Sequence, residues 1–224
     1  MDKKSQSAFI ITLVFFIAMI GYASYATIAP VISPTETSTS SSTGGRLAFT
    51  SSGGSNVTLH VAQNNMYKTD GSLAASTNAN VNIVLETDGL KKVCCSYKLK
   101  WNWASGVTYT KSSGTTANEI TAVGNLSAKY KNSSNSLVAI TVTGNPMFTS
   151  QLPNSSSSDK TIYTTTTTTE ICNKNSSVLS KYVLQTWNIA VNVYSLGVNQ
   201  DALLGKSLTG SVAVDEVNCS KRND

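Results

Sequence analysis

The stretch Val93-Cys-Cys-Ser-Tyr-Lys-Leu-Lys-Trp-Asn-Trp103 decides the fold class of this chain. Its apolar side chains alternate with polar ones, so that Lys98, Lys100 and Asn102 share one face. The opposite face carries Val93, Cys95, Tyr97, Leu99, Trp101 and Trp103. A period of two predicts a β-strand with one buried and one solvent-facing side. A later segment repeats the pattern with Trp187, Ile189, Val191 and Val193.

Short segments of the same kind recur along the chain between clusters of Gly, Ser, Asn and Asp. They predict strands at residues 46–51, 56–62, 81–87, 92–103, 107–110, 119–123, 126–130, 137–143, 161–172, 182–194 and 207–219. Strands at this spacing, without crossover helices, predict an all-β fold: an antiparallel β-sandwich of jelly-roll or Greek-key type.

Three local features refine this prediction. The apolar positions of the last strand change parity after Val214, so a β-bulge is expected near Asp215-Glu216. Residues 201–205 predict a single helical turn, with Asp201 as its N-cap and Gly205 as its stop. The threonine run at 164–169 suits an edge strand, or a strand laid over the surface, better than a central strand, because it would present Thr on both faces.

The N-terminal segment predicts where the protein works. Lys3-Lys4 precedes an apolar run from Ala8 to Gly21, and a chain poor in charge and rich in Ser, Thr and Asn follows. This order is typical of a membrane-insertion signal followed by an exported domain. Small residues favour signal-peptidase cleavage after Ala26. The alternative is retention as an anchor, because the apolar span reaches membrane length when it is counted on to Ala29.

The predicted organisation has three parts. Residues 1–32 are a signal peptide or single-pass membrane anchor, forming an N-terminal hydrophobic helix, and residues 33–45 are a flexible Ser/Thr-rich linker. Residues 46–224 are one β-sandwich domain, since roughly 180 residues supply one hydrophobic core. The net charge of +5 comes from a chain that is only 13% charged and has no concentrated basic field, so we expect no nucleic-acid partner.

The four cysteines are Cys94, Cys95, Cys172 and Cys219. An even number of cysteines in an exported chain predicts disulfides rather than a metal site or a catalytic thiol. Neighbouring residues of a strand point to opposite faces, so Cys94 and Cys95 should each bond to a different partner. We favour Cys95 with Cys219 and Cys94 with Cys172, while other pairings and free thiols stay open.

The side chains needed for catalysis are sparse. His60 is the single histidine, and the sequence contains no zinc-binding spacing and no Gly-x-Ser-x-Gly motif. The pair Asp215-Glu216 lacks the further nearby carboxylates that a calcium site uses. A glycosidase pair among the scattered carboxylates would depend on geometry. We therefore expect a protein that is not an enzyme, with no catalytic residue, metal ligand or cofactor.

Carbohydrate binding is the main competing function. Sandwich lectins stack sugars on exposed aromatic rings beside Asn and Asp, and this chain has three Trp, nine Tyr and abundant Asn. However, Trp101, Trp103 and Trp187 all fall on faces assigned to the core, so we expect burial of at least two of them.

Two parts of the chain carry a resemblance to a known group. The leader from Phe15 to Thr27 resembles the leaders of TasA-like and camelysin-type surface proteins of Gram-positive bacteria. The segment from Trp187 to Gln200, with Gly205-Lys206 and the closing strand to Cys219, is similar to exported proteins of that group, as is the segment from Cys95 to Trp101.

The resemblance implies a jelly-roll domain at the cell surface or in the extracellular matrix, where the matrix proteins assemble into fibres by passing a strand between subunits. Camelysin-type relatives have been described as metalloproteases. That activity is not carried over, because this chain has one histidine and no zinc motif.

Together these patterns predict an exported cell-surface or extracellular-matrix structural protein that assembles by strand exchange or acts as an adhesin. The segment from Ala29 to Ser51 is the natural donor, since it is free at one end. The alternatives are a carbohydrate-binding β-sandwich module and, less favoured, a surface hydrolase. The expected partners are the membrane through the leader, other copies of the chain, and cell-wall or host glycans. The expected location is extracellular or at the cell surface, membrane-anchored if the leader is retained.

Overall fold

The computed structural model describes residues 47–54, 56–61, 73–109, 119–145, 147–157, 159–175 and 178–222. The chain divides into two units, Met1–Ser33 and Pro34–Asp224, and every described residue belongs to the second. The predicted leader, the candidate cleavage site at Ala26 and the linker at 33–45 lie outside the described residues. Within the described ranges, no helix is both long and apolar enough to span a membrane.

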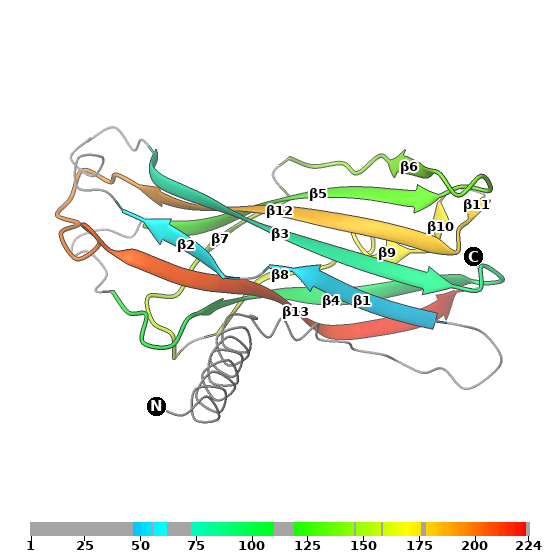
Figure 1. The fold of residues 1–224 in the computed structure, drawn as a ribbon, viewed down its shortest axis with the longest axis horizontal. Coiled ribbons are helices and arrows are strands. Elements are labelled where there is room, and N and C mark those ends of the chain that lie inside the picture. The colour runs from blue at the N-terminus through cyan, green and yellow to red at the C-terminus, as the bar shows by residue number, and fades with distance from the viewer. Residues whose placement is uncertain are drawn as a thin grey trace, which may run out of the picture. The chain divides into compact units, whose positions relative to one another are not determined.

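The larger of the two main sheets is antiparallel and has six strands (Figure 1). These are β1 (Leu47–Gly53), β3 (Leu73–Thr87), β5 (Ile120–Lys131), β6 (Leu137–Ile140), β7 (Phe148–Gln151) and β12 (Tyr182–Tyr194). Their order is β1-β3-β12-β5-β6, and β7 also pairs with β5. The sheet is held mainly by β12, which pairs with β3 on one side and with β5 on the other.

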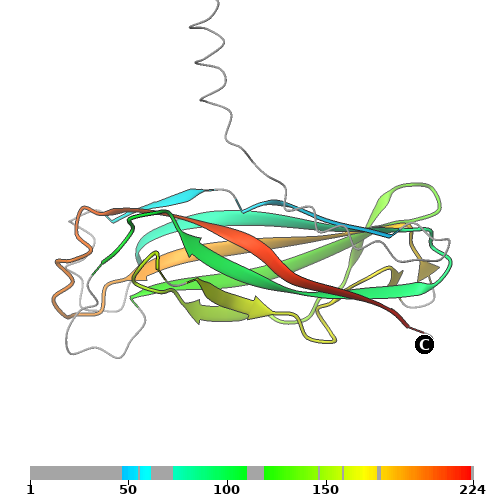
Figure 2. The same cartoon turned by 90° about the horizontal axis from the view of Figure 1, so that it is seen from below.

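The second main sheet is also antiparallel and lies against the first (Figure 2). Its strands are β2 (Val57–His60), β4 (Lys92–Trp103), β8 (Lys160–Thr164), β9 (Ile171–Cys172) and β13 (Ser207–Arg222). The order is β2-β13-β4-β8, and β9 pairs with β4. A separate hairpin is formed by β10 (Lys174–Asn175) and β11 (Val178–Leu179).

The core fills the space between the two main sheets, as expected for a β-sandwich. From the second sheet, Tyr97, Leu99 and Trp101 of β4 are almost fully buried. From the first sheet, β12 contributes Trp187 and Ile189, which are also fully buried. The predicted inward face of β4 and the predicted all-β class are therefore confirmed.

The bulge in β13 is also confirmed. The pairing with β4 shifts between Asp215 and Asn218, and Glu216 has a positive φ of 50°. The extra residue returns the later part of the strand to the correct parity, so that Cys219 lies directly opposite Cys95.

Several predicted strand boundaries are wrong. The strands predicted at 119–123 and 126–130 are one strand, β5, and β3 begins at Leu73 rather than at residue 81. Thr108 forms only an isolated bridge with Ser155, instead of belonging to a strand at 107–110. The strand predicted at 161–172 is divided into β8 and β9.

Only Thr164 of the threonine run belongs to a strand, the edge strand β8, and this corrects the prediction for residues 165–169. The run leaves β8 after Thr164 and forms a turn in which the amides of Thr169 and Glu170 both donate to the carbonyl of Thr166. The Thr165 hydroxyl is buried and accepts a hydrogen bond from the Tyr97 amide at 2.9 Å. Threonine hydroxyls compete with strand partners for backbone groups, and here that competition produces a turn.

Candidate functional site

The four cysteines form two disulfides, Cys94–Cys172 and Cys95–Cys219. This is the pairing that the sequence favoured. Each bond joins residues that lie directly opposite each other on paired strands, β4 with β9 and β4 with β13. Strand β4 is therefore covalently linked to a neighbour on each side.

The remaining polar residues considered from the sequence are not brought together. His60 is exposed on β2, where its Nδ1 lies 2.7 Å from the Ser207 hydroxyl. Asp215 and Glu216 form ion pairs with Lys100 and Lys98. The hydrogen bond from Lys100 is the main cause that lowers the pKa of Asp215, and the same bond raises the pKa of Lys100. These carboxylates are thus neutralised by lysines rather than arranged around a cation.

One group of possible metal ligands is found in the part of the chain that the structure describes. Cys94, Glu170 and Cys172 bring their ligand atoms within 4.8 Å of one another. Both sulfurs belong to the same disulfide, and a metal binds thiolates rather than a disulfide. The Glu170 carboxylate is paired with Arg222 at 2.6 Å. This group therefore does not offer a metal site in the oxidised protein.

The tryptophans required for a stacking sugar site are in the core. Trp187 has no exposed surface, and Trp101 and Trp103 are only 1% and 6% exposed. Trp187 packs against Tyr163, whose ring centroid is 4.7 Å away. The prediction that at least two tryptophans are buried is confirmed for all three.

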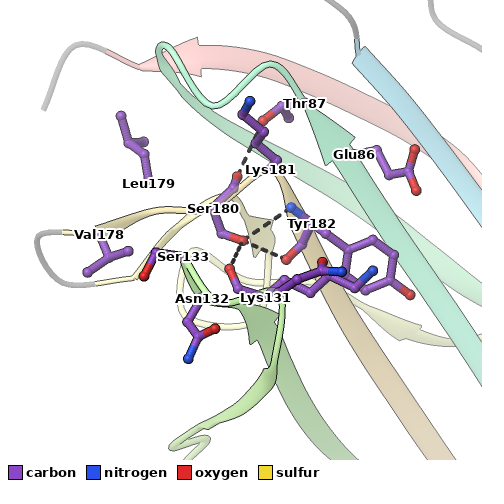
Figure 3. Close-up of a pocket in the computed structure, with 11 residues that line it drawn as sticks. Glu86, Thr87, Lys131, Asn132, Ser133, Val178, Leu179, Ser180, Lys181 and Tyr182 are labelled. Atoms are coloured by element: carbon purple, nitrogen blue, oxygen red, sulfur yellow. Dashed lines mark hydrogen bonds between the residues drawn. The ribbon is translucent and has the colours of Figure 1, made fainter.

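Within the described residues, a pocket with a volume of about 580 Å³ lies where β3, β5 and β12 meet the β10–β11 hairpin (Figure 3). Its walls come from three separate parts of the chain. The residues that line it are Glu86, Thr87, Lys131, Asn132, Ser133, Asn135, Val178, Leu179, Ser180, Lys181 and Tyr182. Cationic, amide and hydroxyl groups therefore stand beside two aliphatic side chains.

Ser180 joins two walls of this pocket. Its hydroxyl lies 2.8 Å from the carbonyl oxygen of Lys131 and 2.7 Å from that of Tyr182, as Figure 3 shows. The amide of Thr87 donates to the carbonyl of Lys181 at 3.0 Å. These bonds connect the ends of β3, β5 and β12 to one another.

Asn173 is fully buried and holds the neighbouring loops in place. Its side-chain oxygen accepts from the Val93 amide at 2.7 Å, and its side-chain nitrogen donates to the Thr87 hydroxyl and the Lys91 carbonyl. Its backbone carbonyl accepts from the Ser180 amide at 2.7 Å. One asparagine thus joins the β3–β4 turn, the start of β4 and the pocket wall. Its hydrogen bonds fix Thr87 and Ser180, two of the residues that line the pocket.

The polar chemistry of the pocket favours an anionic ligand. The Lys131 ammonium lies 4.5 Å from the centroid of the Tyr182 ring, a cation–π contact that occupies one face of the ring. Lys181 supplies a second cation, and Glu86 is the one carboxylate in the lining. The groups available for binding are cations and hydrogen-bond donors rather than a free aromatic face.

The sequence did not predict this pocket. Its lining residues are spread between Glu86 and Tyr182, and they meet only because β12 pairs with both β3 and β5. The one local signal was the group Val178-Leu179, which interrupts an otherwise polar segment.

Comparisons with known proteins do not identify the chain. No family model matches the sequence, and no curated protein matches it. Among solved structures, a chain described as "Structure of infectious bursal disease virus Gt strain" is 11% identical and has a TM-score of 0.19. The match covers 79% of this chain and 39% of that chain. A TM-score this low supports no conclusion about fold or function.

Proposed function

We propose that the protein is an exported structural or adhesive protein of a cell surface or extracellular matrix. The observation that carries this proposal is the pair of disulfides that link β4 to β9 and to β13. Stable structural disulfides form in oxidising compartments and are rare in the cytosol. The resemblance of the leader to those of TasA-like proteins supports the same location.

The strand order supports a sandwich of Greek-key type. The order β1-β3-β12-β5 follows the A-B-E-D sheet of immunoglobulin domains when strands are lettered along the chain. In the second sheet, β4 and β13 correspond to C and F, while β2 takes the edge position that strand G holds in that fold. An N-terminal strand thus occupies a place that a C-terminal strand usually fills.

Assembly by strand exchange is the form of this function that the edge strands support best. β1 lies at the edge of the first sheet and pairs with β3 from Leu47 to Gly53. Its Phe49 is 2% exposed and packs in the core, where its ring contacts Tyr97. β1 therefore combines a hydrogen-bonding edge with an apolar anchor, the two features that strand addition uses. The same strand supplied by a neighbouring copy would make identical contacts.

Paired cysteines test this mechanism directly. Thr50 and Val84 are opposite each other on β1 and β3, so Thr50→Cys with Val84→Cys should form a disulfide wherever the two strands pair. If β1 is exchanged, non-reducing gels of the assembled protein will show a ladder of covalent multimers that reduction removes. The control, Val84→Cys with Leu184→Cys, joins β3 to β12 and should link only within one chain. Multimers absent from the Thr50/Val84 variant of assembled material would rule out exchange of β1.

Export has its own test. Free thiols of the native protein should be alkylated at the time of cell lysis, and the intact mass of the protein should then be measured. Two disulfides predict no alkylated cysteine, and the same mass reports whether cleavage has occurred after Ala26. Four alkylated cysteines in protein treated at lysis would place the chain in a reducing compartment and would contradict the proposal.

Glycan binding is less well supported. The pocket offers amide and hydroxyl groups near Tyr182, but Lys131 covers one face of that ring and the three tryptophans are buried. Binding of a neutral glycan on an array would favour this alternative.

A further inference from the structure

Charge is distributed unevenly along the sandwich. Of the twelve cationic residues that the structure describes, eight lie at or next to the strand ends that meet at the pocket. This group, here called the basic pole, contains Lys91, Lys92, Lys129, Lys131, Lys174, Lys181, Lys221 and Arg222. The described carboxylates in the same region are Glu86, Asp88 and Glu170. The other four described cations are accompanied by five carboxylates, so the fold concentrates positive charge at one end. The sequence did not predict this concentration, because the eight residues are spread along the chain between Lys91 and Arg222.

Exposed aliphatic side chains gather at the same end. Among the described residues, five large apolar side chains are exposed. Four of them lie at the end of the sandwich that carries the basic pole: Leu90, Leu137, Val178 and Leu179. Leu90 is 76% exposed and follows a turn in which the Leu90 amide donates to the Asp88 carboxylate at 3.0 Å. The turn therefore presents an aliphatic side chain to solvent next to Lys91 and Lys92. These four aliphatic side chains therefore share one end of the sandwich with the lysines of the basic pole.

The polypeptide also enters the sandwich at this end. Leu47, the first described residue, is paired with Thr87 at the end of β3, and Thr87 lines the pocket. The first described strand, β1, therefore begins at the basic pole.

We propose that the basic pole is a membrane-facing surface that binds the headgroups of an anionic lipid bilayer. Leu90, Val178 and Leu179 enter the interfacial region, while Lys131 and Lys181 bind lipid phosphates at the pocket. Aliphatic side chains beside lysines match a lipid bilayer, whose interior is apolar and whose headgroups are negatively charged. A soluble anionic polymer would satisfy the lysines but would leave the aliphatic side chains in water. The inference rests on the proposed export only in that an exported chain meets the outer face of a membrane.

A tryptophan reporter tests the proposal on the full chain. Leu90→Trp places the reporter on the basic pole, and the matched control Leu73→Trp places it at the far end of β3, where Leu73 is 51% exposed. Each variant is reconstituted through its leader into vesicles that contain brominated lipid, with or without 30% anionic lipid. The three native tryptophans are at most 6% exposed and give a constant background. Circular dichroism and the oxidised intact mass confirm folding of each variant.

The expected result is blue-shifted, quenched emission from Leu90→Trp in anionic vesicles, reversed by high salt because the attraction is screened. Leu73→Trp should show neither change. Lys91→Gln and Lys181→Gln are then added to the Leu90→Trp variant. They should reduce the ratio of molecules whose basic pole contacts lipid to molecules whose pole does not by roughly 30-fold. The matched pair Lys160→Gln and Lys206→Gln, away from the pole, should leave the quenching unchanged.

Three outcomes would overturn the proposal. Equal quenching of Leu90→Trp and Leu73→Trp would mean that the pole has no preferred contact with lipid. Equal quenching in neutral vesicles would mean that the leader alone brings the protein to the surface. Salt-sensitive binding to inorganic polyphosphate without quenching in anionic vesicles would identify a soluble polymer as the partner. None of these outcomes bears on β1 exchange or on the disulfide test of export.

Discussion

At the scale of single residues, Tyr97 connects the two sheets through a buried hydrogen-bond network. Its hydroxyl donates to Oε1 of Gln185 at 2.6 Å and accepts from Nε1 of Trp187 at 2.7 Å. Gln185 in turn donates through Nε2 to the carbonyl of Thr169 at 3.1 Å. Every member of this network has a partner, so a polar group lies in the core without the penalty of an unpaired donor.

Burial also makes Tyr97 sensitive to alkaline pH. Desolvation raises the pKa of its hydroxyl far above the ordinary value near 10. The folded protein therefore keeps the proton at a pH where the unfolded chain loses it. The resulting stabilisation is complete below about pH 10 and is lost as the pH rises beyond that value, by up to about 1.4 kcal/mol per pH unit.

Replacing Tyr97 with Phe tests both consequences. The substitution leaves Trp187 Nε1 and Gln185 without this partner, so the free energy of unfolding at pH 7 should fall by about 1–3 kcal/mol. Between pH 10 and 12, the stability of the variant should decline less steeply than that of the wild type. Urea unfolding at several pH values measures both quantities. Parallel declines for the two proteins would mean that Tyr97 ionises as readily in the folded state as in the unfolded one.

Tyr109 provides a companion measurement. Burial, and then the nearby charge of Glu119, raise the pKa of its hydroxyl. Tyr109→Phe should therefore also flatten the alkaline decline without disturbing the network of Tyr97.

At the scale of elements, the structure separates strands that are visible in the sequence from those that are not. β4 and β12 match their predicted bounds, because long apolar residues alternate along their whole length. The first part of β3 was missed because its buried positions are occupied by Ala74 and Ala79, which give almost no hydrophobic signal. The pocket was missed for a different reason: it is formed by tertiary contacts between strand ends, which no local pattern encodes.

Gly124 explains why β5 was mistaken for two strands. The dipeptide Gly124-Asn125 suggests a turn, yet both residues lie inside β5 and pair with β12. Glycine is required there because a Cβ atom would lie only 1.9 Å from the Phe148 ring. Phe148 stacks on Tyr163 with a centroid distance of 5.2 Å. The glycine therefore creates the space in which β7 packs, a role that the sequence alone does not distinguish from a turn.

The substitution Gly124→Ala should consequently destabilise the protein. Displacing the Phe148 ring is expected to lower the free energy of unfolding by about 1–3 kcal/mol, partly offset by the reduced backbone entropy of alanine in the unfolded chain. Denaturant unfolding measures the change. The cycle with Phe148→Ala is decisive, because the alanine at 124 should cost much less once the ring is gone. Additive effects of the two substitutions would show that Gly124 serves another purpose.

At the scale of the whole molecule, the two disulfides constrain the same central strand over long stretches of chain. They connect residues 78 and 124 positions apart. In the chain-entropy model, each bond stabilises the fold by roughly 4–5 kcal/mol through its effect on the unfolded state. Because the dependence on loop length is logarithmic, the two contributions should differ by only about 0.4 kcal/mol. A typical domain has a total stability of about 5–15 kcal/mol, so these bonds supply a large part of it.

The sharpest prediction of this model is that the two disulfides contribute nearly equal amounts to the free energy of unfolding. Cys94→Ala with Cys172→Ala and Cys95→Ala with Cys219→Ala should each lower the free energy of unfolding by about 4–5 kcal/mol in urea titrations at neutral pH. The four-alanine protein should lose less than the sum of the two changes, because the two loops share most of their residues and are not independent constraints. A pair whose removal changes stability by less than about 1 kcal/mol would contradict the chain-entropy explanation for that bond. Such a result would assign the folding constraint to the other disulfide and would show that β4 needs only one covalent neighbour to keep its place between β13 and β9.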